Sequence, residues 1–213
     1  MPDGVFVEDA AVVLDDVAII TRPGAVSRRA ETESVATALE RFRPLRRIEP
    51  PATLDGGDVL AIDGTLYVGL SQRTNMAAIE QLNARPSPAA ANSAPSPSGE
   101  GGPKGRVRGV PIRFDGCLHL KSAITQIGER TLLMNPQWVD ASQFRDFEVI
   151  AVDPQEPFAA NALRIDDILL YSASYPRTRR LLESRGFHVE TLDLFELEKA
   201  EAGVTCCSLI FSE

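Results

Sequence analysis

The order in which short strand patterns and helical patterns recur constrains the fold of this chain more than any other feature. A strand, a tight turn, a second strand, a helix and a third strand follow one another repeatedly, as in residues 11–48 and 162–192. The period is roughly 45–60 residues, and longer across the middle of the chain. One such ββαβ unit leaves its sheet half covered, so it must pack on neighbouring units. The repeat therefore favours a closed, propeller-like α/β assembly, and periodicity alone leaves an open α/β sheet as the alternative.

The individual elements are predicted from alternation, turn residues and helical spacing. Helices are expected at residues 27–42, 73–82 and 177–185, each opening near a serine or threonine. The expected strands are residues 11–20 (two runs around an Asp-Asp turn), 58–62, 65–69, 123–127, 131–133, 147–152, 162–165 and 167–171, with further strands in LRRIEP and FHVETL.

Residues 84–109 interrupt this pattern. The segment holds five of the 15 prolines and five of the 15 glycines and almost no large apolar side chains. Such a composition cannot offset the entropy lost on ordering. We expect a disordered, low-complexity insertion in a surface loop of one domain that spans residues 1–213; a linker between two domains is the alternative.

Charge and cysteine usage exclude several classes of protein. A net charge of −8 and a pI of about 4.9 argue against nucleic-acid and acidic-membrane partners. No apolar run is long enough for a transmembrane helix, and the N-terminus does not have the pattern of a secretory signal. Three cysteines, at 117, 206 and 207, form neither a disulfide framework nor a zinc motif. We therefore expect a reducing, cytoplasmic location.

Residues suited to nucleophilic catalysis occur in separate parts of the chain. Carboxylates gather in PDGVFVEDA and LDGGDVL, and arginines stand at two expected helix starts, SRR and SQRTN. His119 lies in GCLHLKS, and Cys206 lies in VTCCSLIF. A buried cysteine is more often a packing residue than a nucleophile when it stands alone. A cysteine, a histidine and carboxylates together are the components of a Cys–His–acid site.

Six motifs in this order resemble the dimethylarginine dimethylaminohydrolase family of the guanidine-modifying pentein superfamily. They cover nearly the whole chain outside residues 84–109 and are PDGVFVEDAAVV, ITRPGAVSRR, LDGGDVL, YVGLSQRTN, GCLHLKS and ELEKAEAGVTCCSLI. The resemblance implies a five-bladed α/β propeller of ββαβ modules. It also implies hydrolysis of asymmetric dimethylarginine or monomethylarginine to citrulline and the methylamine, within arginine metabolism and nitric oxide regulation.

The resemblance also implies a role for each matched residue. Cys206, which precedes Cys207 and Ser208 in a Cys-x-Ser pattern, would be the nucleophile that forms a covalent thiouronium intermediate. His119 would act as general acid and then as base, oriented by Asp55. The expected substrate-binding residues are Asp9 on the guanidinium with Asp3 and Glu8 beside it, Arg28 and Arg73 on the α-carboxylate, and the backbone carbonyl of Ala200 on the α-amine.

The same resemblance implies no organic cofactor and no required metal, although zinc held by Cys206 and His119 would inhibit. The expected partner is a small methylated arginine, and the expected assembly is a monomer or weak homodimer. Family members carry a further ββαβ segment with a lid loop ahead of PDGVFVEDA, so we expect one blade of five to be absent or incomplete.

Two other functions remain open at this point. Arginine deiminases and amidinotransferases resemble His-x-Asp at the histidine motif, where this chain has Lys121 in place of the second carboxylate. The lysine favours a methylarginine hydrolase, because methylated nitrogens have fewer hydrogen bonds to donate. A truncated, non-catalytic binding protein that retains the pocket is the other alternative.

Overall fold

The computed structural model describes residues 2–84 and 107–211. They form four three-stranded sheets with one topology: a hairpin, then a third strand parallel to the second. The sheets contain β1 (Ala11–Val13), β2 (Ala18–Ile20) and β3 (Leu45–Arg47); β4 (Val59–Ile62), β5 (Thr65–Gly69) and β6 (Arg108–Ile112); β7 (Ile124–Gly128), β8 (Thr131–Met134) and β9 (Glu148–Ala151); β10 (Ala162–Ile165), β11 (Ile168–Ser172) and β12 (His188–Leu192). The repeated ββαβ module is therefore confirmed, and the open single sheet is wrong.

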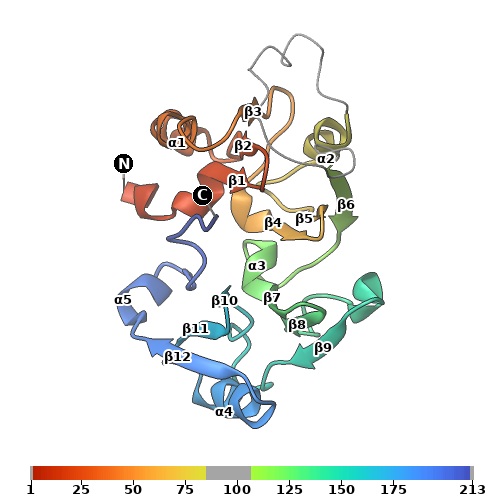
Figure 1. The fold of residues 1–213 in the computed structure, drawn as a ribbon, viewed down its shortest axis with the longest axis vertical. Coiled ribbons are helices and arrows are strands. Elements are labelled where there is room, and N and C mark those ends of the chain that lie inside the picture. The colour runs from red at the N-terminus through yellow and green to blue at the C-terminus, as the bar shows by residue number, and fades with distance from the viewer. Residues whose placement is uncertain (1, 85–106, 212–213) are drawn as a thin grey trace, which may run out of the picture.

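A helix connects the second and third strands in three of these modules, and these helices lie at the periphery (Figure 1). They are α1 (Glu31–Leu39), α2 (Met76–Asn83) and α4 (Pro176–Ser184). In the third module a 3-10 helix, Ala141–Phe144, takes that place. Two four-residue helices, α3 (Leu120–Ala123) and α5 (Phe195–Glu198), lie outside the repeat.

A side-chain cap on α2 and a separate 3-10 turn before α1 explain where two predicted helix starts differ from the observed ones. Asn75 caps α2, its side-chain oxygen accepting from the Ala78 amide, so this helix begins at Met76 rather than at residue 73. Before α1, Val26–Arg28 forms a separate 3-10 turn, so the predicted helix 27–42 shortens to Glu31–Leu39.

The expected insertion extends too far towards the C-terminus. Arg108 and Gly109 belong to β6, where they pair with Thr65 and Leu66 of β5. Proline is compatible with this strand at Pro111, because β6 lies at the edge of its sheet. At the other end, the amide of Ala84 caps α2. The rest of the expected insertion, 85–106, lies outside the described residues.

The hydrophobic core is divided among the contacts between neighbouring modules. Three apolar clusters join the first module to the second, the second to the third and the third to the fourth. A fourth cluster packs α1 on β1 and β2, with Leu209 and Phe211 of the C-terminal segment against it. No helix within 2–84 or 107–211 has the length and apolarity needed to cross a membrane.

The first strand of every module lies innermost. Residues of β1, β4, β7 and β10, with the C-terminal segment, surround a cavity of about 490 Å³. The chain segments that enter these four strands contact one another. The 3-10 turn before β1 packs on the 3-10 turn before β4, that turn packs on α3, and Asn161 before β10 donates to the backbone oxygen of Lys121 in α3.

Candidate active site

Several of the residues singled out from the sequence lie in the segments that lead into the inner strands of three different modules. Asp9 precedes β1, Asp55 precedes β4, and His119 precedes β7 by the length of helix α3. Asn161 directly precedes β10 and was not predicted. The repeat itself is the signal that points to Asn161, because it places this residue where the other modules carry chemically active side chains.

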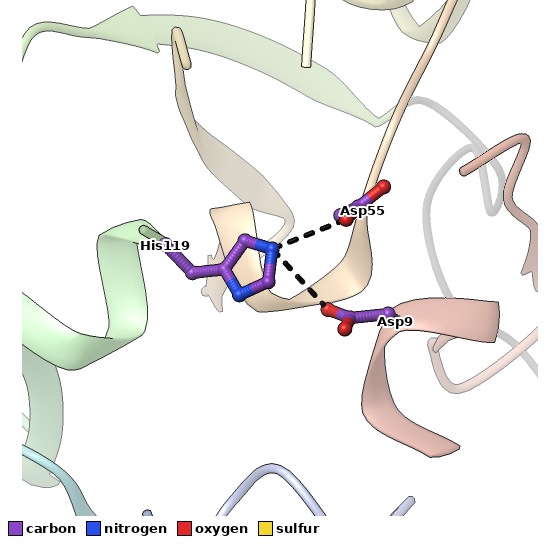
Figure 2. Close-up of side chains that lie close together, drawn as sticks. All are labelled: Asp9, Asp55 and His119. Carbon is purple, nitrogen blue, oxygen red and sulfur yellow. Dashed lines mark hydrogen bonds and ion pairs between the residues drawn. The ribbon is translucent and has the colours of Figure 1, made fainter. Parts of the chain in front are cut away.

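Two carboxylates approach the same ring nitrogen of His119 (Figure 2). Its Nε2 is 3.1 Å from Asp55 Oδ2 and 3.8 Å from Asp9 Oδ1. Asp55 is almost fully buried and is itself fixed, because its Oδ1 accepts from the amide of Gly24 at 2.9 Å. Within the described part of the chain, Nδ1 of His119 has no hydrogen-bond partner, which leaves that nitrogen available for a ligand.

These carboxylates raise the pKa of His119. Burial by itself would lower the pKa, but the hydrogen bond to Asp55 and the charges of Asp9 and Asp58 outweigh it. The geometry therefore favours an imidazolium, the form that donates a proton.

The two glycines of LDGGD allow the protein's own elements to approach one another. A Cβ on Gly56 would lie 1.9 Å from the backbone oxygen of Glu8. A Cβ on Gly57 would lie 2.9 Å from both Asp9 Oδ1 and His119 Cγ, while the Gly57 amide donates to Asp9 Oδ1 at 3.0 Å. The two glycines therefore allow close packing of the residues that build the site.

Asp58, the second carboxylate of LDGGD, holds the backbone next to His119 in place. It is fully buried, accepts from the Leu120 amide at 3.0 Å and accepts from the Ser71 hydroxyl at 2.6 Å. Burial raises its pKa, and the charge of His119 together with these hydrogen bonds partly offsets the rise. Asp58 thereby fixes the start of α3, which carries His119 at its N-terminal end.

Cys206 lies in a C-terminal loop that contacts the first module. The amide of Glu8 donates to the Cys206 carbonyl at 3.1 Å, so the cysteine is adjacent to the Glu8–Asp9 segment. Its Sγ accepts from the Gly203 amide at 3.3 Å. Glu8 is also bonded by the Lys121 ammonium at 2.6 Å and by the Thr205 hydroxyl at 2.9 Å.

The surroundings of Cys206 favour the protonated thiol. Burial, followed by the charges of Glu8 and Asp9, raises its pKa to about 12, and the Gly203 amide and Lys121 offset only part of that rise. The carboxylates of the first module therefore oppose formation of the thiolate.

The structure places the two predicted carboxylate-binding arginines in different surroundings. The guanidinium of Arg28 is buried between Asp9 and Glu31, and it also donates to the backbone oxygens of Asp3 and Phe6. Burial lowers its pKa, but Glu31 and Asp9 more than compensate, so the net shift is upward. Arg28 therefore acts here as an internal cation, and its predicted contact with substrate remains a prediction.

The remaining predicted binding residues lie towards the surface. Arg73 is half-buried, and its guanidinium bonds no group of the described residues, which leaves its donors available for an anion. Asp3 and Ala200 are exposed, Ala200 directly following Lys199 at the end of α5.

One set of potential metal ligands occurs among the described residues, and it does not include Cys206. Ligand atoms of Asp9, Asp55 and His119 lie within 4.8 Å of one another. These atoms already bond one another and the Gly57 amide, so we assign them to hydrogen bonding. Zinc bound by Cys206 and His119 remains a prediction from the resemblance.

Comparison with known proteins connects this geometry to one family. No family model matches the chain. The chain is 35% identical over 212 residues to the N(G),N(G)-dimethylarginine dimethylaminohydrolase of Pseudomonas aeruginosa, covering 99% of the chain and 77% of that protein. It is 42% identical over 214 residues to the protein of the same name from Streptomyces coelicolor, covering 100% of the chain and 76% of the relative.

A comparison with solved structures identifies the same family. The P. aeruginosa enzyme, as a Cys-to-Ser mutant complexed with citrulline, superposes with a TM-score of 0.85 at 34% identity, over 99% of this chain and 77% of that one. The N-terminal domain of ArgZ, a cyanobacterial arginine dihydrolase, gives a TM-score of 0.78 at 20% identity over 98% and 75% of the two chains, which shows the shared fold. The chain has the propeller-like pentein fold and belongs to the dimethylarginine dimethylaminohydrolase family of hydrolases.

Proposed function

We propose that this chain hydrolyses N-methylated arginine, asymmetric dimethylarginine or monomethylarginine, to citrulline and the corresponding methylamine. One observation supports this most directly: three separate parts of the chain bring a nucleophile, a proton carrier and carboxylates together. The backbone carbonyl of Cys206 accepts a hydrogen bond from the Glu8 amide. Oδ1 of the adjacent Asp9 lies 3.8 Å from Nε2 of His119, and the same Nε2 is hydrogen-bonded to Asp55. The names of the relatives supply the substrate class.

The electrostatics of the site suit a cationic substrate. Burial is the largest cause of the raised Cys206 pKa, followed by the charge of Glu8 and a smaller contribution from Asp9; a guanidinium bound near Asp9 would offset part of this negative charge, so binding would favour the thiolate. Substrate then generates its own nucleophile, and the free chain keeps a less reactive thiol. Arg73 would bind the α-carboxylate, and this assignment is supported by its guanidinium, which has no partner among the described residues.

The proposed chemistry has two stages. Sγ of Cys206 attacks the guanidinium carbon, the bond to the methylated nitrogen breaks, and His119 donates a proton to the departing amine. The neutral histidine then takes a proton from water, whose oxygen attacks the thiouronium carbon. Cleavage of the C–S bond releases citrulline and restores Cys206. Removal of methylated arginines by this route would link the chain to arginine metabolism and nitric oxide regulation.

Lys121 is the observation that favours this reaction over arginine deimination. Its ammonium is bonded to Glu8, so this position contributes no carboxylate to a guanidinium. One edge of an unmethylated guanidinium would have N–H groups without a hydrogen-bond acceptor. A methylated nitrogen has fewer N–H groups, so the missing acceptor costs less binding free energy.

The test is citrulline formation from dimethylarginine, monomethylarginine and arginine on the purified chain. We expect turnover of the methylated substrates, poor turnover of arginine, and none of either in Cys206→Ser. Equal turnover of arginine would assign a deiminase, and binding of dimethylarginine without citrulline would assign a non-catalytic binding protein.

A further inference from the structure

We propose that Asn161 is a positioning residue for the nucleophile, acting through the loop of residues 203–206 that carries Cys206. The proposal rests on the function proposed above for the role of Cys206. Asn161 is 5% exposed and lies directly before β10, in the segment that leads into this inner strand, as Asp9 lies in the segment that leads into β1.

The side-chain amide of Asn161 hydrogen-bonds both the backbone and the side chain of Thr205. Its Oδ1 accepts from the Thr205 backbone amide at 3.1 Å, and its Nδ2 donates to the Thr205 hydroxyl at 3.0 Å. The same Nδ2 donates to the backbone oxygen of Lys121 at 3.0 Å. Three of the four hydrogen bonds available to an asparagine are thus made, and two of them go to the residue preceding the nucleophile.

Asn161 also fixes Gly203 by direct packing. A Cβ on Gly203 would lie 2.3 Å from Cγ and Oδ1 of Asn161, so only glycine fits against this amide. Gly203 in turn closes the loop on Cys206: its amide donates to Sγ at 3.3 Å, and its carbonyl accepts from the Cys206 amide at 3.3 Å. Removing the Asn161 side chain would therefore release the donor that is aimed at the sulfur.

The contacts of Asn161 connect the loop to the rest of the site. The Thr205 hydroxyl, which accepts from Asn161, donates to Glu8 at 2.9 Å, and Lys121 bonds the other oxygen of Glu8 at 2.6 Å. Hydrogen bonds and an ion pair therefore connect segments of the first, third and fourth modules to the loop that carries Cys206. Because Asn161 bonds the residue that precedes Cys206 and makes no hydrogen bond to Sγ, its role is to place the sulfur for attack.

The experiment measures alkylation of Cys206 by iodoacetamide at one fixed pH in a Cys207→Ser background, and kcat and KM for dimethylarginine in the same proteins. In Asn161→Ala we expect the alkylation rate constant to fall about tenfold or more, because the sulfur loses a hydrogen bond that favours the thiolate. We expect kcat to fall about 10- to 100-fold with little change in KM, because the substrate contacts remain while the nucleophile is misplaced.

Asn135 provides the matched control. It is a buried asparagine that donates to the Pro157 carbonyl and accepts from the Gln137 amide, both at 2.9 Å, and it makes no contact with the Cys206 loop. Asn135→Ala should lose comparable stability, measured by thermal unfolding, and keep wild-type alkylation and kcat. Equal effects of the two asparagine variants on alkylation, or unchanged or faster alkylation in Asn161→Ala, would overturn the proposal.

A second variant keeps the test decisive if Asn161→Ala does not fold. Gly203→Ala disturbs the same contact from the loop side, and it should slow alkylation by a similar factor. In a double variant with Asn161→Ala the slowing should not add, because both changes break one contact. Wild-type alkylation in Gly203→Ala would contradict the proposal. A wild-type chain that forms no citrulline would refute the proposed function alone, since alkylation needs no turnover.

Discussion

Replacing Arg28 by alanine separates a structural role of this arginine from a substrate-binding one. Its guanidinium lies between the carboxylates of Asp9 and Glu31, and the three side chains are only 8%, 7% and 10% exposed. Two backbone oxygens, of Asp3 and Phe6, complete its hydrogen bonds. The variant would leave two buried carboxylates facing each other without their cation.

The expected cost follows from that burial. Removing one partner of a buried ion pair typically costs about 3–5 kcal/mol in the free energy of unfolding, because the remaining charge is left uncompensated. For a chain of this size each kcal/mol lowers Tm by about 2–4 °C, so we expect Arg28→Ala to lower Tm by about 6–20 °C. Effects on KM measured in this variant would therefore include damage to Asp9.

Urea denaturation and thermal unfolding provide the assay, with Arg47→Ala as the matched control. Arg47 forms a two-point ion pair with Glu33 of α1 at 2.8 and 3.0 Å, but the side chains are 42% and 69% exposed. That exposed pair should contribute at most about 1 kcal/mol. If Arg28→Ala costs no more than Arg47→Ala while it raises KM strongly, the internal-cation role is wrong and the contact with the substrate carboxylate is correct.

Three further predictions concern the chemistry. Arg73→Ala should raise KM by about 10- to 150-fold with little change in Tm, because a charge-assisted bond to substrate is lost; an unchanged KM would exclude this contact. Asp55→Asn should lower the pKa of His119, as an NMR titration would show. Because the wild-type pKa of His119 is raised, its contribution to stability is full below about pH 6.5 and is lost as pH rises through the folded-state value, so the stability gap between wild type and Asp55→Asn should be larger at pH 6 than at pH 9. A gap that is equal at both pH values would contradict this. A haloamidine inactivator should form its adduct on Cys206; an adduct mainly on Cys207 with an active Cys206→Ser would reverse the assignment of the nucleophile.

The sequence by itself determined the repeated module and most of its strands. Alternation of apolar residues within a few positions reports which side of a strand is buried, and this signal is local. Hairpin turns such as Asp63–Gly64, both with positive φ, are likewise encoded by adjacent residues. Strand β6 was missed because its first residues, Arg108 and Gly109, continue the glycine-rich composition of the preceding segment, and composition does not show pairing with β5.

The candidate residues also came from the sequence, but only the tertiary structure decided what they contact. His119 and Asp55 are 64 positions apart, and Thr205 and Glu8 are 197 apart, so their bonds depend on how the four modules close around the central cavity. Closure brings the segments that enter the inner strands into contact, which pairs Arg28 with Asp9 and brings Asn161 to the Cys206 loop. Local patterns do not encode such contacts, because the packing angle between modules is set by the apolar clusters they share, and that packing is a property of the assembled fold.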